Sequence, residues 1–136
     1  MDNTINKKDL YYEWKEIADG DYDLAKRVFD SHWPKQHIRI CFNAQQASEK
    51  YLKGYLAFQG EEIAKTYVLQ ELIDACKKYD DKFEQLREKC KYLTPFAAQI
   101  RYPNNVFDIT EVESKKALDY TKTIIDFVQE KMNNIV

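Results

Sequence analysis

The chain has 136 residues, 44% of them hydrophobic and 32% charged, with 10 Tyr, 7 Phe and 2 Trp. This length suits a single domain over residues 1–136 that buries its own core, and the aromatic content excludes a disordered chain. The net charge of -2, from 21 basic and 23 acidic residues, excludes the basic surplus of proteins that coat duplex DNA.

The first predicted helix covers about residues 9–30, with Asp9 as its N-cap and Trp33-Pro34 beyond its end. Only three Gly and three Pro interrupt the whole sequence, which favours long helices over a β-rich fold. Apolar residues recur at three- and four-residue steps and are expected to face inward. They are Trp14, Ile17, Ala18, Leu24, Ala25 and Val28.

The second helix is expected over residues 36–58. It is predicted to be the central helix of the bundle, because the alanines on its apolar face allow a neighbouring helix to approach closely. Gly60 follows at the position of a left-handed C-terminal cap. A narrow polar line lies opposite the apolar face. It is interpreted as a solvated face, unless a neighbour covers it and its groups must pair or bind a ligand. The apolar face holds Ile40, Ala44, Ala47, Tyr51, Tyr55 and Phe58, and the polar line holds Arg39, Asn43, Gln46, Lys50 and Lys53.

Three more helices are expected in the second half of the chain. A short one runs from Thr66, its predicted N-cap, to about residue 79, and a fourth covers residues 81–101 with a kink or break at Pro95. Pro103 prevents its continuation. Thr110 and Glu113 form a capping box that starts a fifth helix ending near residue 133. The fold class is therefore all-α, an up-and-down bundle of about five helices.

The cysteines and the N-terminus predict a cytoplasmic protein. Cys41, Cys76 and Cys90 are far apart, no C-x-x-C occurs, and only two His are present, so reduced thiols and no metal site are expected. The first residues do not resemble a signal peptide, and the apolar runs are too short to span a membrane. No cofactor is expected apart from a nucleotide held as a ligand.

Arg101 and Tyr102 end the fourth predicted helix and allow two interpretations. The guanidinium complements the negative end of the helix dipole, which needs no function to explain it. A guanidinium beside a tyrosine ring also suits a phosphate or a nucleobase, through bidentate hydrogen bonds and stacking.

Four strings together resemble one known family. They are Trp14 with Ala18 and Asp21 to Ala25, then Ala44-Gln45-Gln46-Ala47-Ser48-Glu49-Lys50-Tyr51-Leu52-Lys53, Lys65-Thr66-Tyr67-Val68-Leu69 and Arg101-Tyr102-Pro103. In this combination and order they are similar to the HEPN domain (higher eukaryotes and prokaryotes nucleotide-binding). The resemblance implies a helical bundle that forms a homodimer and binds a nucleotide or RNA. It also implies a toxin–antitoxin-like pairing with a minimal nucleotidyltransferase, here a separate protein.

Two positions depart from the family pattern. Tyr67 stands where members usually carry His. Ribonuclease members carry an Arg followed by His after four to six residues, but the eligible positions after Arg101 are Val106, Phe107 and Asp108. Without an imidazole, the usual group for moving a proton near neutral pH is missing. An Arg followed by His after four residues does occur, at Arg27 and His32, but it falls at the end of the first helix instead.

These observations favour a binding module without turnover, although enzymatic activity stays open. Its expected ligand-binding residues are Gln46, Lys50, Lys53, Arg101 and Tyr102. The alternative is a metal-independent endoribonuclease toxin that uses Arg101, or Arg27 with His32. A third hypothesis is a dimeric scaffold with no ligand.

Overall fold

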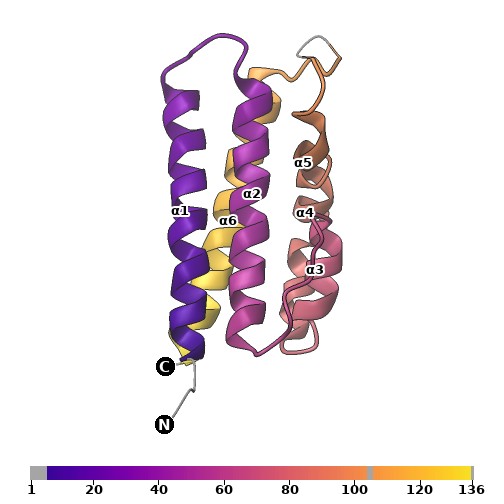
Figure 1. Cartoon of the computed structure of the whole chain (residues 1–136). Helices are drawn as coiled ribbons and strands as arrows, with labels where there is room; N and C mark the ends of the chain where they lie inside the picture. Colours follow the sequence, from indigo (N-terminus) through magenta and orange to yellow (C-terminus); the bar gives the residue numbers. More distant parts are fainter. Residues whose placement is uncertain (1–5, 104–105, 136) are drawn as a thin grey trace.

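The computed structural model describes residues 6–103 and 106–135, and these ranges are all-α with no strand. Three long helices run the length of the bundle (Figure 1). They are α1 (Lys7–Asp30), α2 (His37–Phe58) and α6 (Glu111–Ile135). Beside α2 stands a column of shorter elements: α3 (Leu69–Cys76), the 3-10 helix η1 (Asp81–Leu86), α4 (Arg87–Leu93) and α5 (Phe96–Gln99). The up-and-down topology is the predicted one.

Helix α2 is the central helix, as its small residues predicted. It packs against α1, α3, α4, α5 and α6. Tyr51 and Leu52 are completely buried, and Gly54 brings α2 close to Trp14 and Tyr11 of α1. Gly60 has a φ of 84°, the left-handed conformation expected after the helix. The predicted apolar face is confirmed, apart from Phe58, which is only half-buried.

Two expectations for α1 are wrong. The N-cap is Asn6 rather than Asp9: its side chain accepts a hydrogen bond of 2.9 Å from the Lys8 amide, and Asp9 lies in the first turn. Ile17 and Leu24 are 55% and 52% exposed. Because α1 is an edge helix that packs mainly against α2 and α6, only a narrow stripe of it is covered. The buried residues of that stripe, Tyr11, Ala18 and Ala25, are spaced seven apart.

The third helix begins later than predicted. Thr66 does not cap it; its hydroxyl accepts a hydrogen bond from the Val68 amide, and the helix starts at Leu69. Residues 61–68 form a non-helical segment that runs from the end of α2 to α3 (Figure 1). The segment returns along α2 as far as Gln45, whose amide donates to the Tyr67 carbonyl over 3.1 Å, before the chain becomes helical again.

Two local signals of the later helices, the break at Pro95 and the capping box, are confirmed. The fourth helix, predicted over residues 81–101, begins as the 3-10 helix η1, continues as α4 and ends with α5 at Gln99. The predicted break is present: α5 begins directly after Pro95, because proline lacks the amide that a continuous helix would need. The capping box is also present. The Glu113 amide donates to the Thr110 hydroxyl over 3.1 Å, and the Thr110 amide donates to the Glu113 carboxylate over 3.2 Å.

A polar cluster of Asp19, Tyr51 and Gln129 joins the three long helices. The Tyr51 hydroxyl of α2 donates to the Asp19 carboxylate of α1, and Gln129 of α6 donates to the Tyr51 oxygen over 3.0 Å. Burial, reinforced by the Asp19 carboxylate, raises the pKa of Tyr51. The tyrosine therefore stays a neutral donor that ties the helices together. No helix within residues 6–103 and 106–135 is long and apolar enough to cross a bilayer.

Candidate functional site

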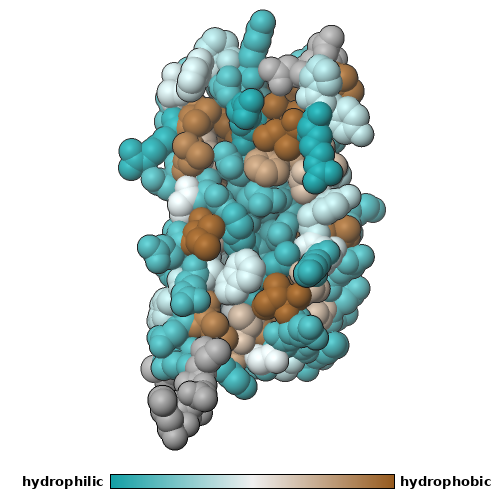
Figure 2. All heavy atoms as spheres, viewed as in Figure 1, coloured by the Kyte–Doolittle hydropathy of each residue, from teal (hydrophilic) through white to brown (hydrophobic). Residues whose placement is uncertain are grey.

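An open groove of about 370 Å³ lies between α2, the non-helical segment 61–68 and α5. The face that contains α2 is mainly hydrophilic along its middle, with separate apolar patches to either side (Figure 2). Nine residues line the groove: Phe42, Gln46, Glu49, Lys53, Lys65, Thr66, Tyr67, Ala97 and Arg101.

Three parts of the chain build this groove. Helix α2 supplies side chains at three- and four-residue steps from Phe42 to Lys53, which places them on one face. The segment before α3 supplies Lys65, Thr66 and Tyr67. The helix is interrupted at Pro95, between α4 and α5, and the opposite wall is supplied by α5 and the residues that follow it. There the Arg101 amide donates to the Ala98 carbonyl over 3.1 Å.

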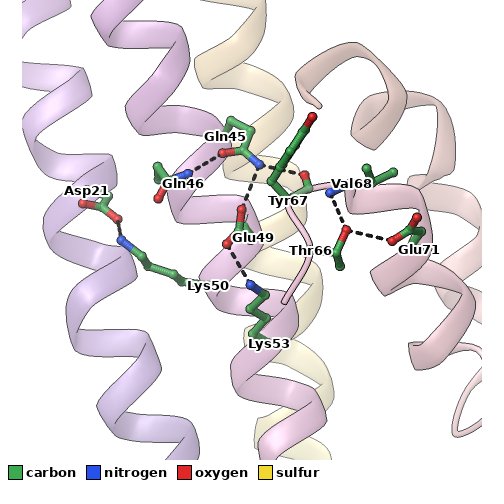
Figure 3. A network of polar contacts seen from close by, with 10 residues as sticks. All are labelled: Asp21, Gln45, Gln46, Glu49, Lys50, Lys53, Thr66, Tyr67, Val68 and Glu71. Atoms are coloured by element: carbon green, nitrogen blue, oxygen red, sulfur yellow. Dashed lines mark hydrogen bonds and ion pairs between the residues drawn. The ribbon is translucent and has the colours of Figure 1, made fainter. Parts of the chain in front are cut away.

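The floor of the groove is a connected polar network (Figure 3). The Lys53 ammonium lies 2.9 Å from a Glu49 carboxylate oxygen, and these side chains are only 10% and 12% exposed. The buried Gln45 amide nitrogen donates to the other Glu49 oxygen and to the Tyr67 carbonyl, each over 3.1 Å. Gln45 therefore fixes both the Glu49–Lys53 pair and the path of the segment that carries Tyr67.

The groove carries a positive charge beside aromatic surface. Lys53, Lys65 and Arg101 line it against a single carboxylate, that of Glu49. Neither Lys65 nor Arg101 has an acidic partner among the described residues. With the rings of Phe42 and Tyr67 in the lining, the arrangement suits an anion attached to a planar group. The lining holds no His, so it offers binding groups rather than an imidazole for proton transfer.

Of the five expected ligand-binding residues, Lys50 and Tyr102 do not line the groove. Lys50 extends to the opposite side of α2, where its ammonium lies 2.6 Å from the Asp21 carboxylate of α1 (Figure 3). Tyr102 is 54% exposed, and its ring stacks edge-on against Phe107 at 5.5 Å between centroids. The structure thus brings together Gln46, Lys53 and Arg101 and separates the remaining two.

Lys65 and Tyr67 are groove residues that the sequence did not single out as ligand contacts. Their only signal was their place in the Lys-Thr-Tyr string of the family resemblance. No helical period could have placed them, because they lie in a non-helical segment whose path depends on Gln45.

The literal Arg27 to His32 match lies at the far end of α1. Arg27 is exposed, and its Nε lies 2.8 Å from a carboxylate oxygen of Asp23. His32 has a φ of 56°, and its Nδ1 lies 3.7 Å from a Glu111 carboxylate oxygen. His32 and His37 line a hollow of about 210 Å³ that shares no lining residue with the groove. Across the described residues, no three His, Cys, Asp or Glu side chains are arranged to hold a metal ion.

Comparisons with known proteins identify the family. A model of the HEPN domain matches residues 11–131. Protein TT1696 from Thermus thermophilus is 26% identical with a TM-score of 0.76, covering 93% of this chain and 99% of that one. ST0689, described as an archaeal HEPN homologue, is 20% identical with a TM-score of 0.70, covering 89% of this chain and 96% of that one. Among curated proteins, none shows significant similarity to the sequence.

Proposed function

The chain belongs to the HEPN domain family, and from that premise we propose that its α2–α5 groove binds the phosphate of a nucleotide or of an RNA end, without turnover. The observation that carries the proposal is the meeting of Lys53, Lys65 and Arg101 in one groove. These groups come from three separate parts of the chain, so no single helix pattern accounts for their convergence.

The charges of the groove set what it can hold. Three cations against the Glu49 carboxylate leave two positive charges, which matches a terminal phosphate carrying about -1.5 to -2 at neutral pH. The Lys53–Glu49 pair is internally neutralised, so the free charge comes from Lys65 and Arg101. Arginine can bind phosphate oxygens through two parallel hydrogen bonds, whereas lysine acts as a point charge.

Binding can be tested by thermal shift and titration calorimetry with nucleoside 5′-monophosphates. A ligand that binds only the folded state raises the melting temperature. Arg101→Ala removes a charge-assisted contact and should weaken binding by about tenfold or more. The matched control is Lys115→Ala, which removes an exposed cation of α6 that pairs with Asp119 and should leave affinity unchanged. Equal loss in both variants, or no binding by the wild type, would count against the groove.

We also propose that the chain forms a homodimer and works beside a separate nucleotidyltransferase, as its family membership suggests. Ile17 and Leu24, exposed on the outer face of α1, are apolar side chains that a second copy could cover. Light scattering should give twice the 16.2 kDa of one chain, and Leu24→Lys should reduce that mass. A monomer at all concentrations would refute the dimer, and a neighbouring gene unrelated to nucleotidyltransferases would weaken the pairing.

A second candidate function, a metal-independent endoribonuclease, is favoured by one observation. His32, His37 and Glu111 surround the hollow at the end of α1, and imidazoles can exchange protons near neutral pH. Incubation with RNA in chelator should then give cleavage that His32→Ala abolishes. RNA that stays intact at high protein concentration would exclude this function.

A further inference from the structure

An open hollow of about 480 Å³ lies between α4 and α6 and shares no lining residue with the α2–α5 groove. Tyr92 of α4 and Tyr120 of α6 meet edge to face there, with 5.3 Å between the centroids of their rings. The Tyr92 hydroxyl donates to the Glu113 carbonyl over 3.0 Å, which holds its ring against α6. We call this site the lysine–tyrosine hollow, and its lining residues are Glu88, Lys91, Tyr92, Pro95, Lys116 and Tyr120.

Lysine side chains lie over the two tyrosine rings. The Lys116 ammonium is 4.6 Å from the centre of the Tyr92 ring and 5.3 Å from that of the Tyr120 ring. The Lys89 ammonium, beside the hollow, is 5.1 Å from the centre of the Tyr120 ring. A ring face attracts an ammonium group without neutralising its charge. Lys89 and Lys116 are therefore held in place and still present positive charge.

These lysines differ from the other cations on the same helices. Within the described residues, Lys89, Lys91 and Lys116 form no ion pair, whereas every other Lys or Arg of α4 and α6 pairs with a carboxylate. The paired residues are Arg87, Lys115, Lys122 and Lys131. Glu88 is the one carboxylate in the lining, so the three unpaired lysines leave an excess of two positive charges at the hollow.

We propose that the lysine–tyrosine hollow docks an acidic segment of a partner protein. Its excess positive charge complements a run of carboxylates, and lysines already ordered by the rings lose less side-chain entropy on binding than free lysines would. Single-stranded RNA fits less well, because it binds through bases that stack on aromatic rings, and ammonium groups already occupy a face of each ring. The docking site is independent of the nucleotide groove.

Fluorescence anisotropy with a labelled hexaglutamate peptide at low salt tests the proposal. Hexaglutamate should bind, and hexaglutamine, the uncharged peptide of the same length, should not. Lys116→Gln removes one charge of the hollow and should weaken hexaglutamate binding by about two- to fivefold, the effect of one exposed charge contact. The matched control is Lys122→Gln, which makes the same change on α6 at a lysine that pairs with Asp126 and should leave the affinity unchanged.

A labelled uridine hexanucleotide separates the two kinds of polyanion. Lys116→Gln should leave the affinity for this RNA unchanged. An equal or larger loss for the hexanucleotide than for hexaglutamate would assign the hollow to RNA and overturn the proposal. No binding of hexaglutamate by the wild type, or the same hexaglutamate affinity in Lys116→Gln and Lys122→Gln, would also overturn it.

Discussion

Replacing Gly54 by alanine tests how closely α1 and α2 pack. A Cβ at this position would lie 2.9 Å from the Trp14 Cβ and 3.3 Å from Cδ1 of Tyr11. The Trp14 Cβ is attached directly to the backbone and cannot swing away, so the two helices must move apart. Overpacking of this kind costs about 1–3 kcal/mol. Alanine in a helix gains about 1 kcal/mol over glycine, so a net loss of about 1 kcal/mol in the free energy of unfolding is expected.

Gly20→Ala is the matched control, because it makes the same chemical change in the middle of α1. A Cβ there would have no atom within 4 Å, so only the helix propensity remains and a gain of up to about 1 kcal/mol is expected. Urea unfolding followed by circular dichroism, at a concentration where the chain is monomeric, measures both. If Gly54→Ala proves as stable as Gly20→Ala, the close approach of α1 and α2 is refuted.

Two further predictions concern stability and thiol chemistry. Thr110→Ala removes the cap of α6 and should cost about 1 kcal/mol, whereas Thr123→Ala, within α6 on its exposed face, should cost much less; equal losses in urea unfolding would contradict the cap. Burial raises the pKa of the Cys41 and Cys90 thiols to about 12. At pH 8 a thiol reagent should therefore label them only as fast as the protein unfolds, and immediate labelling of the folded protein would contradict their burial.

Several features encoded by close neighbours in sequence could be predicted, although the N-caps expected at Asp9 and Thr66 were wrong. The capping box, the break at Pro95 and the left-handed Gly60 each depend on residues a few positions apart, and all three are present. The inward face of α1 could not be predicted in the same way. Ile17 and Leu24 fit the apolar period, but their exposure depends on how many helices cover α1, which the local pattern does not contain.

The candidate site likewise combines features that the local sequence predicts with features that depend on tertiary contacts. Lys50 and Lys53 are about 60° apart around α2, so spacing alone places them on one line. Only the partner of Lys50 comes from another helix, because its ammonium pairs with Asp21 of α1, whereas Lys53 pairs with Glu49 four residues earlier on α2 itself. Lys65 enters the groove because a buried glutamine holds the segment that carries it. Such placements depend on tertiary contacts rather than on periodicity.

Chemical-shift mapping with AMP tests most directly whether the α2–α5 groove is the ligand site. Titration of the labelled protein should shift the amide signals of Gln46, Lys53 and Tyr67 together with the side-chain signal of Arg101, and leave the signals around His32 unchanged. Shifts confined to the His32 hollow, or no shifts at millimolar AMP, would contradict the assignment of the groove.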